Sequence, residues 1–187
     1  EAFAPRSIRP VAQISVTIGT LVLALIDLIS IRTKTSTTAA MGSVIFDGPA
    51  VVMQGSILII SILAVFLIAD TENFAAAAAA IPGSEEERES LQSGQTITEV
   101  FPLTLFAVSG MLIFPIASDL ITLFVALEML SLPLYLMAGL SRRRRLLSQE
   151  AALKYFLLGA FSSAFFLFGA AYLYGYSGSV SFAGIRS

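Results

Sequence analysis

The stretch LITLFVALEMLSLPLYLMAGL, residues 120–140, decides the fold class. It contains one charged side chain, Glu128, and eleven Leu, Ile, Phe and Val residues. An α-helix rises about 1.5 Å per residue, so a stretch of this length covers about 30 Å, the thickness of the hydrocarbon core of a bilayer. We therefore expect residues 120–140 to form a membrane-spanning helix.

Apolar stretches of similar character lie on both sides of it, at residues 11–31, 51–69, 100–117 and 151–175. The five stretches together contain only three charged residues, Asp27, Glu128 and Lys154. In the whole chain of 187 residues, 56% are hydrophobic and 13% are charged, whereas about 25% are charged in an average soluble domain. The sequence predicts an all-α polytopic membrane protein with about five transmembrane helices.

One membrane domain over residues 1–187 accounts for all of these stretches, with a polar loop at residues 70–99 between the second and the third. The chain begins with Glu1 rather than Met. Its first apolar stretch is also too long for the apolar region of a secretory signal peptide. We therefore expect the sequence to be a fragment of a larger subunit.

The composition excludes several classes of chemistry. The chain contains no Cys and no His, so it cannot form a thiolate zinc site, an iron–sulfur cluster, a His-ligated haem or a Ser-His-Asp triad. We expect this chain to bind no metal or other cofactor. The net charge of −2 and the lack of a basic stripe with interleaved aromatic residues argue against nucleic acid as a partner.

The distribution of Lys and Arg predicts the orientation in the membrane. If the five stretches alternate in direction, one side of the membrane, here called side one, holds seven basic residues: Arg6, Arg9, Arg88 and Arg142 to Arg145. The opposite side, side two, holds Arg32, Lys34 and Arg186. An excess of Lys and Arg marks the cytoplasmic side. We expect residue 1 and the loops 70–99 and 141–148 to be cytoplasmic, in a cell inner (plasma) membrane.

Glu128 is the candidate functional residue of the 120–140 stretch. An acidic residue near the bilayer centre is costly, and such residues usually mark a proton or ion path. Ser131 and Tyr135 lie on the same helix face as Glu128. Pro133 should kink the helix and free the carbonyl of Met129 for water or a side chain. The alternative for Glu128 is a protonated carboxyl that is merely packed against a neighbouring helix.

Lys154 is the second candidate, and we expect it about 9 Å from Glu128 in depth. One or two waters would then bridge the two groups. The alternative for Lys154 is a side chain that extends to the interface and pairs with Glu150, four residues earlier. Asp27 lies near the end of its stretch and should be interfacial. Small residues at four-residue spacing predict a close-packing face on the last helix: Gly159, Ala160, Ser163 and Ala164.

Two segments resemble subunit N of the proton-pumping NADH:quinone oxidoreductases, respiratory complex I, in the antiporter-like membrane subunit family. They are DLITLFVALEMLSLPLYL, residues 119–136, and QEAALKYFLLGA, residues 149–160. The resemblance implies that Glu128 and Lys154 belong to a proton pathway. It also implies a parent subunit of about fourteen helices in two inverted repeats, with a lysine of the next helix beyond Ser187.

The resemblance further implies that proton translocation is coupled to electron transfer from NADH to quinone, carried out by other membrane and redox subunits that hold FMN and iron–sulfur clusters. Two other interpretations stay open from the residues alone. The chain is then either a membrane scaffold subunit, in which Glu128 and Lys154 are packed and neutral, or an independent cation or proton antiporter.

Overall fold

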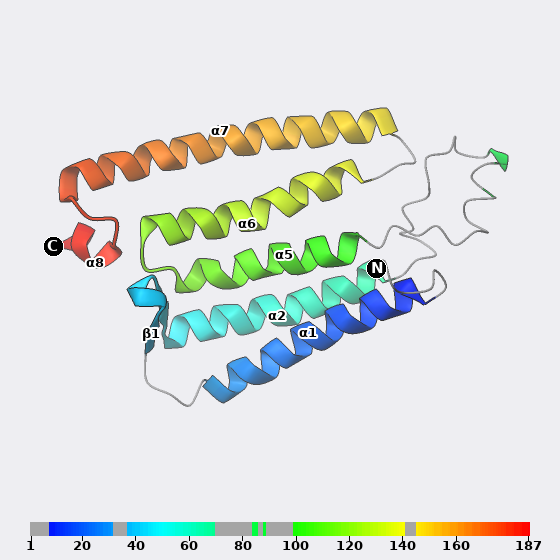
Figure 1. Ribbon diagram of the computed structural model, residues 1–187, viewed down its shortest axis with the longest axis horizontal. Coiled ribbons are helices and arrows are strands. Elements are labelled where there is room, and N and C mark those ends of the chain that lie inside the picture. Colours follow the sequence, from blue (N-terminus) through cyan, green and yellow to red (C-terminus); the bar gives the residue numbers. More distant parts are fainter. Residues whose placement is uncertain (1–7, 32–36, 70–83, 86–87, 89–98, 141–144) are drawn as a thin grey trace.

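A computed structural model describes residues 8–31, 37–69, 84–85, 88, 99–140 and 145–187. Five long helices lie side by side (Figure 1): α1 Arg9–Ile31, α2 Gly48–Ile68, α5 Val100–Ile113, α6 Leu120–Gly139 and α7 Arg145–Ser177. Four of the five apolar stretches form helices long and apolar enough to cross a membrane, and the third forms a shorter apolar helix. The predicted all-α membrane fold is confirmed.

Short elements complete the described fold at one end of the bundle. A β-hairpin pairs β1 Thr37–Ala39 with β2 Val44–Phe46 in antiparallel register, around the 3₁₀ turn η1 Ala40–Gly42. A second 3₁₀ turn, η2 Phe114–Ile116, follows α5. The last helix is α8, Phe182–Arg186. The hairpin lies between the first two predicted apolar stretches, where three-residue strands leave little sequence pattern.

Side-chain caps, a proline and a glycine mark where the helices begin and end. Asp47 caps α2 by accepting a hydrogen bond from the backbone N–H of Ala50 at 2.8 Å, and Asp119 caps α6 in the same way with Thr122 at 2.7 Å. Pro115 cannot donate a backbone hydrogen bond, and α5 tightens into η2 around it. α7 ends before Gly178, which adopts a φ of 66°.

α7 differs from its predicted extent. It begins at Arg145, six residues before the predicted stretch 151–175, and ends at Ser177. Its 33 residues correspond to about 50 Å, more than the hydrocarbon core requires. Residues 145–148 of the predicted loop 141–148 therefore belong to the helix. Residues 141–144 and nearly all of the predicted loop 70–99 lie outside the described residues.

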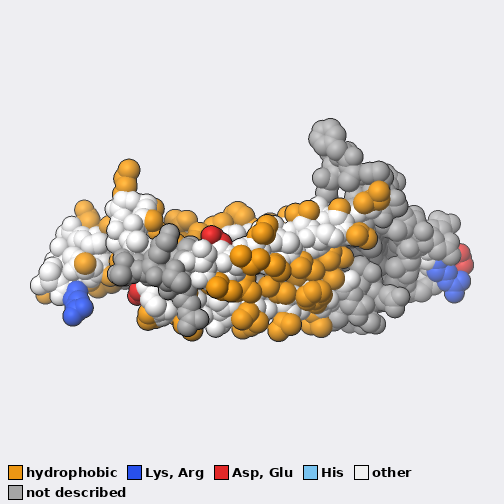
Figure 2. Space-filling view, turned by 90° about the horizontal axis from the view of Figure 1, so that it is seen from below, with side chains coloured by type: hydrophobic (Ala, Val, Ile, Leu, Met, Phe, Trp, Pro, Cys, Tyr) orange, Lys and Arg blue, Asp and Glu red, His pale blue; other side chains and the backbone are white. Residues whose placement is uncertain are grey.

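The bundle has two separate packing regions. A hydrophobic core joins α1, α2 and α5, and its buried members are Leu21, Leu28, Leu58, Val65, Phe101 and Val108. α6 packs on α5 on one side and on α7 on the other. In Figure 2, hydrophobic side chains cover the middle of the visible face, and the Lys and Arg side chains drawn there lie near its two ends. This is the distribution that a membrane-spanning bundle requires.

Candidate functional site

Glu128 lies in the interior of α6, eight residues after the helix begins at Leu120. This places it about 12 Å from the side-two end of α6. The side chain is half-buried, as is Ser131, whereas Pro133 and Tyr135 are buried. α6 continues through Pro133 to Gly139. The predicted polar face of α6 thus faces the interior of the bundle, with Glu128 as its carboxyl group.

Ser163 of α7 is the partner of Glu128. Its hydroxyl donates a hydrogen bond to Oε1 of the Glu128 carboxyl, and its side chain is only 8% exposed. Sequence reasoning placed Ser163 on a packing face and missed this contact. The signal was present, since a small polar residue on the face of the neighbouring helix is the usual donor to a polar group inside a membrane.

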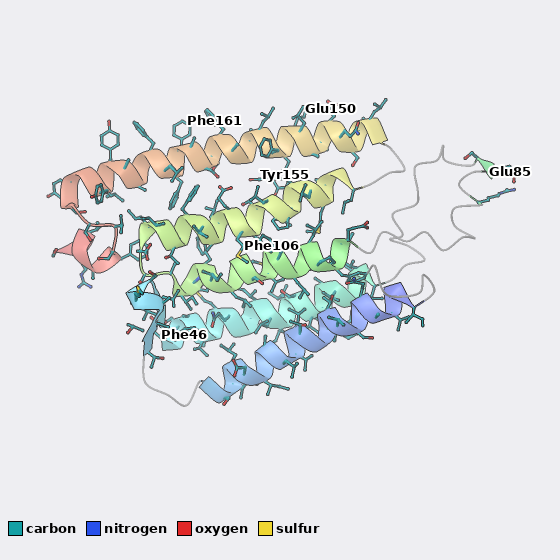
Figure 3. The ribbon with its side chains drawn as sticks, viewed as in Figure 1. Phe46, Glu85, Phe106, Glu150, Tyr155 and Phe161 are labelled. Carbon is teal, nitrogen blue, oxygen red and sulfur yellow. The ribbon has the colours of Figure 1, made fainter. Side chains whose placement is uncertain are left out.

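The interface between α6 and α7 is closed by aromatic contacts on both sides of this hydrogen bond. Toward side two, the rings of Phe124 and Phe166 stack at 5.8 Å between centroids. Toward side one, the ring of Tyr135 meets Tyr155 edge-on at 4.7 Å, and Figure 3 shows Tyr155 between the two helices. The Tyr135 hydroxyl lies where a Cβ on Gly159 would be. Glu128 and Ser163 therefore meet inside a packed interface.

The opposite side of α6 is held by α5 through Gly110. A Cβ on Gly110 would lie 2.4 Å from the backbone nitrogen of Leu130 and 2.8 Å from the carbonyl oxygen of Ala126. No side chain fits in that space, so the two helix backbones are in direct contact around the turn that carries Glu128. The position of the Glu128 backbone is thus fixed by α5, and that of its carboxyl by α7.

Lys154 lies elsewhere. Its Nζ donates to Oε1 of Glu150 at 2.6 Å, and the two side chains are 70% and 57% exposed. Nine residues separate Lys154 from Ser163, which is two and a half helical turns. Lys154 therefore points away from α6, about 14 Å along α7 from the residue that binds Glu128. The structure does not bring Glu128 and Lys154 together.

The depth of Lys154 also differs from the expectation. A Cβ on Gly139, the last residue of α6, would lie 3.3 Å from Cβ of Ala152, and Ser148 donates to the carbonyl of Ala138 at 2.7 Å. Ala152 is therefore level with the end of α6. Lys154, two residues later, lies about 3 Å further along α7, toward the centre of the bundle. The predicted alternative, a pair with Glu150 close to the interface, is the arrangement that the structure contains.

The predicted packing face of α7 is half correct. Gly159 and Ser163 face α6, whereas Ala160 and Ala164 are exposed. Exposed aromatic side chains share that outer surface of α7, among them Phe161 and Phe165. Asp27 is exposed on α1, four residues before the helix ends.

Asp119 forms a second polar centre, at the side-two end. Its carboxylate accepts hydrogen bonds from the backbone N–H and the hydroxyl of Thr122, at 2.7 and 2.8 Å. Burial acts to raise the pKa of Asp119, but the hydrogen bonds from Thr122, Ser43 and Ile121 outweigh it, so the pKa lies below the usual 3.8. These bonds favour the ionised carboxylate at the start of α6.

Backbone hydrogen bonds gather three chain segments around this carboxylate. Ser118 donates to the carbonyl of Ser43 at 2.9 Å, Phe182 donates to Ser118 at 3.0 Å, and Leu120 donates to Val180 at 3.0 Å. The β-hairpin, the α5–α6 turn and the segment after α7 therefore lie at the same end of the bundle, as the alternating direction of the five helices requires (Figure 1).

Among the described residues, no group of three or more Asp and Glu side chains is arranged to hold a metal ion. Glu128 combines a position inside an apolar helix with a hydroxyl partner, so its carboxyl can exchange a proton without leaving the protein interior.

Comparison with known proteins places this geometry in a family. Residues 117–187 match the family model described as NADH:quinone oxidoreductase/Mrp antiporter, transmembrane. The NADH-quinone oxidoreductase subunit N of Acidothermus cellulolyticus is 56% identical over 192 residues, covering 100% of this chain and 37% of the relative. The subunit N of Rhodococcus opacus is 50% identical over 210 residues, covering 99% of this chain and 39% of the relative.

A solved structure gives the same result. The respiratory complex I of Thermus thermophilus with bound aureothin contains a chain with a TM-score of 0.69 and 32% sequence identity, covering 92% of this chain and 33% of that one. The chain spans less than two fifths of the length of these relatives. Over that span, the chain belongs to the antiporter-like membrane subunit family of the NADH:quinone oxidoreductases and is similar to subunit N.

Proposed function

We propose that this chain contributes to proton translocation in the membrane part of an NADH:quinone oxidoreductase, with Glu128 as a proton-exchanging group. The observation that carries the proposal is the placement of the Glu128 carboxyl inside α6, between the α5 backbone and the Ser163 hydroxyl. A titratable group placed at such depth has a cost that a purely apolar side chain would avoid. Ser131, Pro133 and Tyr135 shape the same face of α6.

Lys154 is proposed as a second proton-exchanging group, near the side-one end of α6 and paired with Glu150. Its amine can lose a proton, which an arginine in its place could not do. Its exposed position on the outer surface of α7 means that any proton path between Lys154 and Glu128 runs through groups other than the α6–α7 interface.

The redox chemistry is assigned to other subunits. We propose that electron transfer from NADH to quinone, with FMN and iron–sulfur clusters, takes place on partner subunits and that this chain binds none of these groups. The name of each curated relative, a subunit of an NADH-quinone oxidoreductase, supports such partners. If the chain instead acted as an independent antiporter, it would purify without redox subunits.

The proposed location is the plasma membrane of a bacterial cell, with side one cytoplasmic. The seven-to-three excess of Lys and Arg on side one supports this orientation. A reporter fused after Arg145 should be cytoplasmic, and a reporter fused after Gly178 should lie on the opposite face. An external reporter after Arg145 would overturn the orientation.

Infrared difference spectroscopy of the intact complex during turnover tests the role of Glu128. A proton-exchanging carboxyl gives a band that appears or disappears as NADH is oxidised, and this band should be absent from the Glu128→Gln variant. If the spectra of the two proteins are the same, Glu128 keeps its protonation state and the chain is a membrane scaffold at this position.

A further inference from the structure

We infer that Ser163 is a positioning residue for Glu128, whose hydroxyl holds the carboxyl toward α7 and stays hydrogen-bonded to it in both protonation states. This inference rests on the proposed proton exchange at Glu128 and adds the group that controls it. Its basis is the hydrogen bond from Ser163 Oγ to Glu128 Oε1 between two helices that are otherwise joined mainly by apolar contacts.

The burial of Ser163 distinguishes it from its neighbours. Its side chain is 8% exposed, whereas Ser162 and Ala164 on either side of it are exposed. No other hydrogen bond to the Glu128 carboxyl is found within the described ranges of the chain. A serine buried against a carboxyl inside an apolar helix pair satisfies a polar group that would otherwise lack a partner.

The chemistry of a hydroxyl suits a carboxyl that gains and loses a proton. Serine has one O–H donor and two acceptor lone pairs, and its hydroxyl rotates freely. The Ser163 hydroxyl donates to the carboxylate when Glu128 is ionised. When Glu128 is protonated, the same hydroxyl donates to the carbonyl oxygen of the carboxyl or accepts from its O–H. A backbone N–H or an ammonium group could only donate, so it would favour one protonation state over the other.

Two aromatic contacts flank the hydrogen bond between Ser163 and Glu128. Phe166 lies three residues after Ser163 and stacks on Phe124, and Gly159 lies four residues before it, beneath Tyr135. Both contacts belong to the same α6–α7 interface and flank the hydrogen bond along it. The packed rings hold α6 and α7 together on both sides of the hydrogen bond, so the Ser163 hydroxyl is kept facing the Glu128 carboxyl.

The test uses the intact complex in vesicles and three variants. Ser163→Ala removes the hydroxyl, Ser163→Thr keeps it, and Ser162→Ala is the matched control on the exposed side of α7. We expect NADH-driven proton pumping to fall about tenfold in Ser163→Ala, the size of effect that loss of a hydrogen bond to a charged group produces. Pumping should recover in Ser163→Thr and stay unchanged in Ser162→Ala.

A spectroscopic measurement separates positioning from a merely structural role. The C=O stretch of the protonated Glu128 carboxyl, identified by its loss in Glu128→Gln, should move to higher frequency in Ser163→Ala, because the hydrogen bond that weakens this bond is gone. It should stay in place in Ser162→Ala. If Ser163→Ala does not assemble, Ser163→Cys keeps the size of the side chain with a much weaker donor, and the same shift is expected.

The outcomes distinguish this inference from the proposed function. Normal pumping in Glu128→Gln contradicts proton exchange at Glu128 itself. Loss of pumping in Glu128→Gln, together with an unmoved band and control-like pumping in Ser163→Ala, leaves the function of Glu128 intact and overturns the role of Ser163.

Discussion

Glu128 and Lys154 both occur in apolar stretches of sequence, yet they differ in burial and in the helix that supplies their hydrogen-bond partner. Glu128 is half-buried between neighbouring helices and is hydrogen-bonded to α7. Lys154 is 70% exposed and bonded within its own helix. The difference arises from angular position, because Lys154 and Ser163 lie on opposite sides of α7. An ionisable residue in an apolar stretch is therefore not automatically an interior residue.

The helices that carry these residues differ in the same way. Within the apolar part of α6, 17% of the residues are buried inside the protein, against 6% within the apolar part of α7. α6 has neighbours on two sides, whereas among the described residues α7 packs along one narrow face. Glu128, unlike Lys154, therefore has an environment that neighbouring helices determine.

The largest structural effect is expected from Gly110→Ala. The new Cβ would lie within 2.8 Å of three α6 backbone atoms, so α6 must move, at a cost of about 1–3 kcal/mol or more. We expect a marked loss of assembled complex on a native gel. Gly55→Ala is the matched control, because its Cβ would meet only Leu28 Cδ2 at an ordinary 3.7 Å. Equal assembly of both variants would show that the α5–α6 contact is not close.

Lys154→Met should lower proton pumping several-fold without moving the infrared band of Glu128. The reason for the second expectation is the separation of about 14 Å along α7. Lys154→Arg should not restore pumping, since arginine keeps its proton. Full activity of the arginine variant would instead assign Lys154 a fixed positive charge, and a displaced Glu128 band would show that the two groups are coupled.

Asp119→Ala should destabilise the bundle more than Asp47→Ala. Both residues cap a helix, and loss of a cap costs about 0.5–2 kcal/mol. Asp119 is 9% exposed and also binds the Thr122 hydroxyl, whereas Asp47 is exposed. We therefore expect Asp119→Ala near the upper end of that range, measured as thermal stability of the purified complex. Equal losses would reduce Asp119 to an ordinary cap.

Acid should remove the same contribution. The pKa of Asp119 is lowered in the folded protein, so the stabilisation is present above 3.8, the usual value, and is lost as the pH falls through the lower folded value. Asp119→Asn should abolish this part of the acid sensitivity. An unchanged acid profile in the asparagine variant would mean that other carboxyl groups account for it.

The smallest effect is expected from Glu150→Gln. The pair with Lys154 is exposed on both sides, and an exposed pair at this spacing contributes about 0.3–0.5 kcal/mol. Assembly and thermal stability should therefore match the unmodified complex. A large loss of stability would indicate that Glu150 is covered in the complex and contacts a further group.

The sequence was sufficient for the fold class, and it singled out the carboxyl around which the proposed function is built. Apolar length located the spans, and depth in its span made Glu128 a candidate. Contacts between helices were harder to predict, because the direction of a side chain on α7 depends on where the helix begins and how it is rotated. That is why Ser163 was not recognised as a partner and why Lys154 was expected nearer to Glu128.

The β-hairpin and the role of Gly110 were also beyond the sequence. Three-residue strands follow no clear period, and the register of β1 and β2 depends on contacts with Ser118 and Ala117 far along the chain. A glycine within an apolar stretch has many possible explanations. Only the distance from Gly110 to the α6 backbone identifies it as a point of close approach.

The central claim, that the enclosed carboxyl of Glu128 exchanges protons, is tested most directly by Glu128→Gln in the intact complex. Glutamine keeps the size of the side chain and its hydrogen bond to Ser163 but cannot titrate, and Glu128→Asp keeps a titratable group with a shorter reach. We predict normal assembly on a native gel for both, NADH-driven proton pumping largely lost in the glutamine variant, and partial pumping in the aspartate variant. Normal assembly with normal pumping in Glu128→Gln would contradict the claim and make Glu128 a packed polar residue.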